Sequence, residues 1–388
     1  MARDESQSPN EPGGARGALV SIAAIGSVLA ASSCCLPVLP FVVAAGFAGG
    51  SAFLAAARPY LLGGSVLLIA YGFYQAWRAK KCGRRPSVIS SVLLWVSALF
   101  VFLSIFFPQV MANTAADLVR LGRTTSVLGK VGNDHFGEFV LQDLKRLGID
   151  TSFVRRSQTH PTSCTFIVNV RGQDRRYLHC FGANADFSIA DIDAKVLDGA
   201  RALYVGGYLA MPAFRPEQLV ELLREAKQRG LITALDVVIP AGSHSGLEDI
   251  RQALFYTDLF LPNEDEARAL TGSSDPLEQA EILGRFNPEG TIVITRGSAG
   301  ALAKRGSEKL RAAAFQVESI DESGSGDAFD AGFLVAMLEG WLLEDSLRFA
   351  SAVGASCTQA LGCHEGVFQF DQALAFVAQN QLEMVKIA

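Results

Sequence analysis

The sequence lacks an excess of basic residues, and this absence removes one class of function. Its 388 residues carry 34 Lys and Arg against 39 Asp and Glu, a formal net charge of −5 at pH 7. Proteins that bind nucleic-acid phosphates need concentrated Lys and Arg. We therefore expect no nucleic-acid partner.

Cysteine is scarce as well, and the few cysteines are scattered. There are seven, an odd number, at positions 34, 35, 82, 164, 180, 357 and 363. A small domain held together by disulfides usually has an even number at close spacing. The sequence therefore predicts no disulfide framework, and the adjacent pair Cys34 and Cys35 is its most unusual feature.

Charged residues are missing from three long stretches near the N-terminus. The stretches are residues 17–57, 59–77 and 86–116. A helix needs about 20 apolar residues to cross a bilayer, so residues 1–112 are predicted to form a membrane domain of about three transmembrane helices. Pro37 and Pro40 interrupt the first stretch, which leaves four spans as an alternative. A cleavable secretion signal fits less well, because the first stretch is only weakly basic at its start.

A short basic segment separates the second and third stretches. Residues 78–85 carry five positive charges and no negative one. Short basic loops remain on the cytoplasmic side of a membrane. If residues 88–107 then cross once, the whole C-terminal part emerges on the outer side.

The N-terminal part contains residues that match a known family. The matching segments are Arg16-Gly17-Ala18-Leu19, Ser33-Cys34-Cys35-Leu36, Arg58-Pro59-Tyr60, Phe73-Tyr74 with Trp77-Arg78, and Phe107-Pro108. With them, residues 15–111 resemble the bacterial mercuric-ion transporters of the MerT type. On packing grounds alone, Cys34 and Cys35 would be two small apolar residues in a helix. Two neighbouring thiols can also converge on a soft cation.

This resemblance implies a multi-pass protein of the bacterial inner membrane with a periplasmic C-terminal domain. Cys34 and Cys35 would take Hg²⁺ from the periplasmic side and pass it to thiols at the cytoplasmic face. The partners would be the lipid bilayer, a periplasmic mercury-binding protein and a cytoplasmic mercuric reductase. The family usually carries two cysteines in its cytoplasmic loop, whereas this loop has only Cys82.

Residues 113–388 show a different pattern, in which apolar strand-like runs alternate with helical segments. The runs are residues 124–128, 165–170, 202–205, 232–236, 259–261 and 291–295. Helical segments, such as residues 216–229 and 265–270, lie between them. Strands separated by helices are typical of a mainly parallel sheet covered on both faces. The sequence therefore predicts an α/β domain after the membrane domain.

The most specific motif of this second part is residues 321–333, Asp-Glu-Ser-Gly-Ser-Gly-Asp-Ala-Phe-Asp-Ala-Gly-Phe. Glycines around Ser325 let the backbone approach an anion, and the helix that starts near Asp327 directs free amides at it. Asp327 is placed to accept a proton from a substrate hydroxyl. Taken alone, an ordinary Gly/Ser turn before a helix explains the motif equally well.

Further segments make the motif part of a family pattern. They are Gly129-Lys130-Val131-Gly132-Asn133-Asp134 with Phe136-Gly137, Gly182-Ala183-Asn184, Pro262-Asn263-Glu264-Asp265-Glu266, and Thr295-Arg296-Gly297-Ser298-Ala299-Gly300. In this order they resemble the PfkB or ribokinase-like carbohydrate and nucleoside kinases.

The resemblance assigns expected roles to single residues. Asp327 would be the catalytic base, and Gly324, Ser325 and Gly326 would form the anion hole. Asn263 and Glu266 would arrange Mg²⁺ and phosphate. The residues along the ATP nucleotide would be Thr295, Gly297 and Gly300. Asn184 would contact the sugar, although Asn after Gly is also a common turn residue.

The second part also departs from the family. Members begin with a strand that carries a substrate-binding acid, followed by a Gly-Gly pair before an Asn-x-Ala helix. Asn113-Thr114-Ala115 resembles that helix start, but Pro108-Gln109 stands where the Gly-Gly pair is expected. We therefore expect a kinase domain without its first strand, which binds Mg-ATP but phosphorylates sugars poorly.

Two functions follow from these patterns. The first is inner-membrane Hg²⁺ transport through paired cysteines, with a carbohydrate kinase-like domain fused to the transporter. The alternative is a membrane-tethered, ATP-dependent sugar kinase, a phosphotransferase with an alcohol acceptor. The outward orientation and the missing first strand make transport the preferred interpretation of the sequence.

Overall fold

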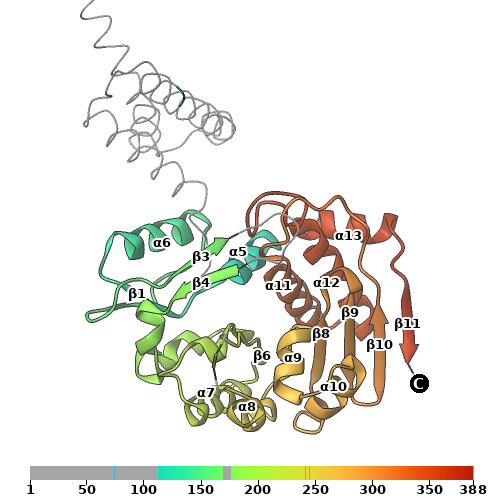
Figure 1. Cartoon of the computed structure of the whole chain (residues 1–388), viewed down its shortest axis with the longest axis horizontal. Coiled ribbons are helices and arrows are strands. Elements are labelled where there is room, and N and C mark those ends of the chain that lie inside the picture. Colours follow the sequence, from blue (N-terminus) through green and yellow to red (C-terminus); the bar gives the residue numbers. More distant parts are fainter. Residues whose placement is uncertain (1–73, 75–111, 169–175, 241, 244, 388) are drawn as a thin grey trace, which may run out of the picture. The chain divides into compact units, whose positions relative to one another are not determined.

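The computed structural model describes residues 74, 112–168, 176–240, 242–243 and 245–387 (Figure 1). The chain divides into two compact units, Met1–Phe107 and Pro108–Ala388. All helices and strands named below belong to the second unit, which is described by itself.

The expected mercury site and, apart from Tyr74, the expected spans up to residue 107 lie outside the described residues. This applies to Cys34, Cys35 and Cys82 alike. Within the described part of the chain, no helix combines the length and the apolar character that a bilayer crossing requires. The membrane domain therefore stays a prediction from the sequence.

The second unit is an α/β domain built on a seven-stranded sheet, as the sequence predicts. The strand order is β11-β10-β9-β8-β7-β6-β5. The parallel strands are β5 (Ala202–Val205), β6 (Ile232–Leu235), β7 (Leu259–Phe260) and β8 (Thr291–Thr295). Helices connect them: α7 (Pro216–Gln228), α8 (Leu247–Leu254), α9 (Glu264–Thr271) and α10 (Pro276–Gly284). Within the described residues the sheet ends at β5.

The other half of the sheet is antiparallel, so the prediction of a mainly parallel sheet is only half right. Its strands are β9 (Ala301–Arg305), β10 (Glu308–Ala312) and β11 (Met384–Ile387). Only Gly306 and Ser307 separate β9 from β10, and a two-residue connection can join only antiparallel strands. The strand predicted at residues 124–128 is also displaced, because strand β1 forms directly after that run, at Gly129–Gly132.

Helices cover both faces of the main sheet, and each face has its own core. Strand β8 illustrates this: Val293 packs with Phe333 and Phe349 on one face, whereas Ile292 and Ile294 belong to the core of the other face. Strands buried on both faces read as continuous apolar runs. The helices on the Val293 side are α5 (Asn113–Arg120), α11 (Ser325–Leu338), α12 (Leu343–Cys357) and α13 (Phe370–Gln379).

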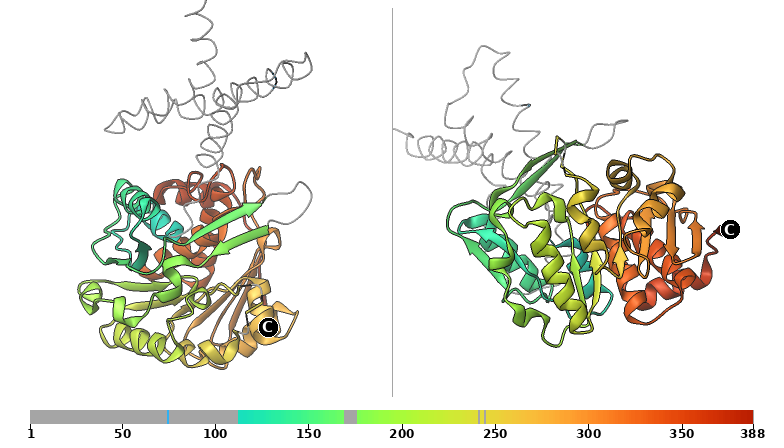
Figure 2. Two further views of the ribbon diagram at one scale, coloured as in Figure 1. Left: turned by 60° about the vertical axis from the view of Figure 1, so that its left-hand side comes forward. Right: turned by 90° about the horizontal axis from the view of Figure 1, so that it is seen from below.

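Two small two-stranded sheets complete the unit. Strand β1 pairs in parallel with β2 (Val154–Ser157) across helix α6 (His135–Arg146). Strand β3 (Cys164–Val168) pairs antiparallel with β4 (Arg176–Cys180). In Figure 2, β3 and β4 are the two green arrows that form a separate ribbon. The short helix η2 (Gly182–Asp186) follows β4 directly.

Candidate active site

The start of helix α11 is a candidate binding site for an anion. Gly324 caps the helix in a left-handed conformation with φ 79°, and a Cβ there would lie 2.3 Å from the carbonyl oxygen of Cys363. Only glycine fits such a position. A Cβ on Gly326 would meet no atom within 4 Å. The Ser325 amide donates to the carbonyl oxygen of Glu322 over 3.3 Å, whereas the space beside Gly326 in the first turn is open and a phosphate can fill it.

Asp327 lies in this first turn, and the start of helix α5 holds its carboxylate in place. The side-chain amide of Asn113 donates to Oδ2 over 3.0 Å, and the Thr114 hydroxyl donates to Oδ1 over 3.1 Å. Burial raises the pKa of Asp327, while these two hydrogen bonds act to lower it. The result is an oriented carboxylate, more basic than an ordinary Asp, which suits a general base.

Further acidic side chains surround Asp327. Asp236, directly after β6, accepts a hydrogen bond from the Gly207 amide over 3.0 Å. Burial first, and then the charge of Glu266, raise the pKa of Asp236 well above its ordinary value. Asp330, one turn further along α11, accepts a hydrogen bond of 2.9 Å from the Tyr204 hydroxyl. Burial and the charges of Asp236 and Asp327 raise the pKa of Asp330.

Asn263 and Glu266 cap each other at the start of helix α9. The Glu266 amide donates to Oδ1 of Asn263, and the Asn263 amide donates to Oε2 of Glu266, each over 2.9 Å. Desolvation raises the pKa of Glu266 to about 7, and the charge of Asp327 acts in the same direction. Glu266 and Asp327 therefore share one electrostatic environment, in which added negative charge is unfavourable and a cation is favoured.

The residues around α9 fit a magnesium ion that arrives with a nucleotide. Among the described residues, no three His, Cys, Asp or Glu side chains are grouped so that they could hold a metal ion by themselves. Mg²⁺ commonly keeps several waters and binds through one or two carboxylates plus substrate phosphates. Glu266, whose charge raises the pKa of Asp236, provides such carboxylates together with Asp236.

The residues expected to lie along the nucleotide are found at the end of the neighbouring strand β8 and directly after it. Thr295, the last residue of β8, forms a parallel bridge with Asn263, and its amide donates to the carbonyl oxygen of Pro262 over 3.1 Å. Gly297 begins the short helix η6 (Gly297–Ala299), which Gly300 ends with φ 85°. The structure therefore brings Thr295, Gly297 and Gly300 to the side of Asn263.

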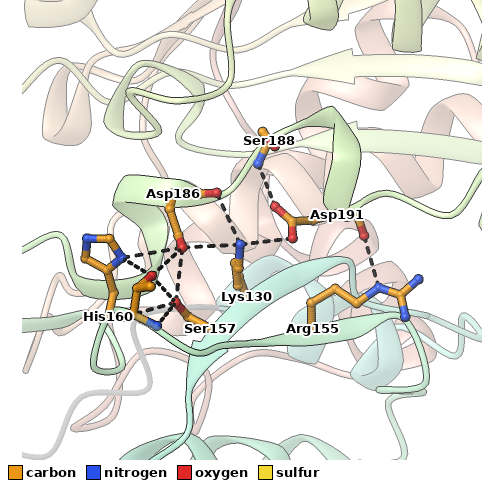
Figure 3. Close-up of polar contacts among 8 residues, drawn as sticks. Lys130, Arg155, Ser157, His160, Asp186, Ser188 and Asp191 are labelled. Carbon is orange, nitrogen blue, oxygen red and sulfur yellow. Dashed lines mark hydrogen bonds and ion pairs between the residues drawn. The ribbon is translucent and has the colours of Figure 1, made fainter.

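Asn184, the expected sugar contact, lies on a different element. It belongs to η2, where the neighbouring Ala183 amide donates to the carbonyl oxygen of Pro161 over 2.7 Å. Figure 3 shows Lys130 between Asp186 and Asp191, with Nζ 3.4 Å and 3.0 Å from their carboxylates. These contacts tie the segment that carries Asn184 to strand β1.

The sequence did not reveal several side chains of this site. It marked the Asn113 segment as a helix start but gave no role to Asn113 or Thr114. It also gave no role to Asp236, although an acid directly after a strand-like run was a usable signal. The Tyr204 and Asp330 pair had no such signal, because 126 residues separate its members.

An aspartate in the first turn of a helix, a glycine loop before it and acidic side chains beside it are the arrangement that the sequence predicts for a carbohydrate kinase of the α/β class. Residues 110–368 match the pfkB family carbohydrate kinases. The chain belongs to this family.

Relatives in other organisms are similar over most of their length. The 5-dehydro-2-deoxygluconokinase of Clostridium perfringens is 28% identical over 287 residues, which cover 70% of this chain and 84% of that protein. An uncharacterized sugar kinase of Archaeoglobus fulgidus is 30% identical over 255 residues, 64% of this chain and 97% of the relative. The ribokinase of Bacillus subtilis is 30% identical over 258 residues, 66% and 82% of the two chains.

Solved structures share the fold. A fructokinase with bound ATP from Xylella fastidiosa has a TM-score of 0.62 at 21% identity, covering 69% of this chain and 89% of that chain. A putative ribokinase II from E. coli in complex with ATP and Mg²⁺ has a TM-score of 0.58 at 20% identity, covering 69% and 88%. The family membership favours the sugar-kinase alternative over Hg²⁺ transport, for which neither the described residues nor these relatives give support.

Proposed function

We propose that this protein transfers a phosphoryl group from ATP to a hydroxyl group of a small sugar or sugar acid. The observation that carries the proposal is the pair of hydrogen bonds from Asn113 and Thr114 to Asp327. They join the first described helix to the helix of the glycine loop. The base is therefore oriented even though the chain departs from the family pattern ahead of Asn113.

The proposed mechanism assigns one task to each group. Asp327 accepts the proton of the attacking hydroxyl as the new oxygen–phosphorus bond forms. The amides at Gly324 and Gly326 stabilise the negative charge that grows on the transferred phosphoryl group, whereas the Ser325 amide donates to the Glu322 carbonyl oxygen. Bound Mg²⁺ would neutralise charge on the ATP phosphates, and Glu266 with Asn263 would hold it. Thr295, Gly297 and Gly300 would lie along the nucleotide.

This proposal replaces the expectation of weak phosphorylation. That expectation assumed that nothing holds the acceptor hydroxyl against Asp327 once the first strand is missing. Asp236, directly after β6, and Asn184, on η2, belong to other segments, which the departure ahead of Asn113 leaves in place. The names of the relatives suggest the acceptors to try, namely 5-dehydro-2-deoxygluconate, ribose and fructose.

The test is an assay of the full-length protein with Mg-ATP and this panel of acceptors. We expect acceptor-dependent ADP release with at least one compound. The Asp327→Asn variant, purified identically, is the blank that reveals contaminating kinases. If no sugar or sugar acid stimulates ADP release above that blank, the proposal is wrong.

The proposed activity also bears on orientation in the membrane. The basic segment at residues 78–85 predicts a periplasmic C-terminal domain, whereas a kinase needs the compartment that contains ATP. Reporter enzymes fused after Ala388 distinguish the two. A reporter that is active only in the cytoplasm should give signal if the kinase works in the cell. Signal only from a periplasmic reporter would contradict a kinase role there.

A further inference from the structure

Two cysteines face each other across the β3–β4 ribbon. Cys164 is the first residue of β3, Cys180 is the last residue of β4, and the antiparallel register pairs them directly. Residues paired in this way have Cα atoms about 4.5–5.5 Å apart, and their side chains lie on the same face of the ribbon. The strand pairing therefore places the two thiols side by side.

The pair is free and open to solvent. Both cysteines are unpaired thiols, Cys180 being exposed and Cys164 half-buried. The next pair in the register, Thr165 and His179, lies on the opposite face, where Oγ1 and Nδ1 are 2.8 Å apart. Burial first, and then the neighbouring Cys180 thiol, raise the pKa of Cys164. Cys164 therefore keeps its proton at neutral pH until a ligand displaces it.

We propose that Cys164 and Cys180 form a binding site for a soft cation that prefers two sulfur ligands, such as Cu⁺ or Hg²⁺. Thiolate ligands select soft cations. Zn²⁺ needs four ligands, and the part of the chain that the structure describes groups no third His, Cys, Asp or Glu with this pair. Binding breaks two S–H bonds, releases two protons and forms two metal–sulfur bonds. No atom changes its oxidation state.

The other cysteine pair of the described residues does not compete for this role. Cys357 is buried, and its thiol donates to the carbonyl oxygens of Cys363 and Ser323 over 3.2 and 3.4 Å. Burial raises the pKa of Cys363 to about 12. Both thiols are therefore enclosed, protonated and, for Cys357, already hydrogen-bonded to the backbone.

Occupation of the site would also affect the neighbouring segment. Cys180 stands only four residues before Asn184 on η2, and Cys164 stands two residues after Thr162, whose hydroxyl donates to Asp134 over 2.6 Å. A metal bridge would fix the start of β3 to the end of β4. The inference concerns these thiols alone and does not depend on the proposed kinase activity.

The experiment uses the full-length protein with Cys34, Cys35 and Cys82 replaced by Ser, so that the described cysteines alone remain. The reduced protein is titrated anaerobically with Hg²⁺ in the presence of excess glutathione. Bound metal is then counted after gel filtration. Because two linked ligands act with a high effective concentration, we expect one retained Hg²⁺ per chain, and at least about 100-fold weaker retention in Cys164→Ser and in Cys180→Ser.

The control is His179→Ala, on the opposite face of the same strand, which should keep its single Hg²⁺. Cys180 is exposed, so its replacement by Ser leaves the fold intact, as an unchanged melting temperature will confirm. Retention of Hg²⁺ by Cys180→Ser would overturn the proposal. Loss of Hg²⁺ to glutathione in the parent, or an equal loss in His179→Ala, would overturn it as well.

Discussion

The two halves of the main sheet differ in what lies at the ends of their strands. In the parallel half, Asp236 follows β6, Asn263 follows β7 and Thr295 ends β8, all at one edge. In the antiparallel half, neighbouring strands run in opposite directions, and pairs such as Lys386 with Glu308 lie exposed between them. Parallel strands gather their carboxyl ends at one edge, and this is why the candidate site forms there.

The largest effect that we expect is on nucleotide binding, at the candidate anion-binding site at the start of α11, beside the parallel half. In Gly326→Val the added methyl groups enter the open space in front of α11. Hydrogen bonds to a charged group contribute about 1.5–3 kcal/mol each, so Mg-ATP affinity should fall about 10- to 100-fold. Calorimetric titration measures it. The control is Gly129→Val in the β1–β2 sheet, where a Cβ also meets no atom within 4 Å. Equal Mg-ATP affinity of both variants would argue against an anion-binding site at the start of α11.

A smaller effect is expected where α5 meets Asp327. Thr114→Val keeps the size of the side chain but removes a hydrogen bond that lowers the pKa of Asp327. The base then binds its proton more tightly, and the acidic limb of the rate profile moves to higher pH, with kcat about 10-fold lower. The control is Thr257→Val, whose hydroxyl donates to the Ala253 carbonyl oxygen in helix α8. It should leave the limb in place. An unmoved limb in Thr114→Val would count against Asp327 as the base.

Asp117 tests stability near the same helix. Its side chain is fully buried, neither oxygen has a hydrogen-bond partner among the residues that the structure describes, and burial raises its pKa to about 8. The folded state then holds a proton that the unfolded chain has lost above about pH 4. Stability therefore falls as pH rises from about 4 to 8, by up to about 1.4 kcal/mol per pH unit. Chemical denaturation at several pH values should show that the free energy of unfolding of Asp117→Asn depends less steeply on pH than that of the parent. Asp371→Asn, an exposed control, should keep the slope of the parent. An unchanged slope in Asp117→Asn would contradict the burial of a protonated acid.

The smallest effect belongs to the antiparallel half. Lys386 and Glu308 are 3.4 Å apart with side chains 72% and 41% exposed. Exposed ion pairs contribute little, so Lys386→Ala should change the free energy of unfolding by less than about 0.5 kcal/mol and leave turnover unchanged. A clear loss of activity in this variant would mean that the antiparallel half takes part in the site.

The parallel half could be predicted from the sequence because each of its strands is a short apolar run between helices. The runs at 202–205, 232–236, 259–261 and 291–295 all became strands. The antiparallel strands mix Lys, Arg and Glu with Ala and Leu, and their direction follows from the tight turn at Gly306. The pattern of hydrophobic residues alone does not contain that direction.

The candidate site divides in the same way. The glycine loop and the base form one continuous segment at residues 321–333, which can be recognised locally. The contact from Asn113 to Asp327 joins residues 214 positions apart and arises only when α5 packs beside α11. A contact of that kind depends on the whole fold, and the sequence therefore gave Asn113 and Thr114 no role.

We propose that Asp327 acts as the base of a phosphoryl transfer at the carboxyl edge of the parallel strands. The most direct measurement follows the γ-phosphate of ATP into the sugar product with the parent protein and with Asp327→Asn, together with Mg-ATP affinity for each. We expect near-equal affinity and a transfer rate about 100- to 10,000-fold lower in the variant. Equal transfer rates for the two proteins would contradict the account.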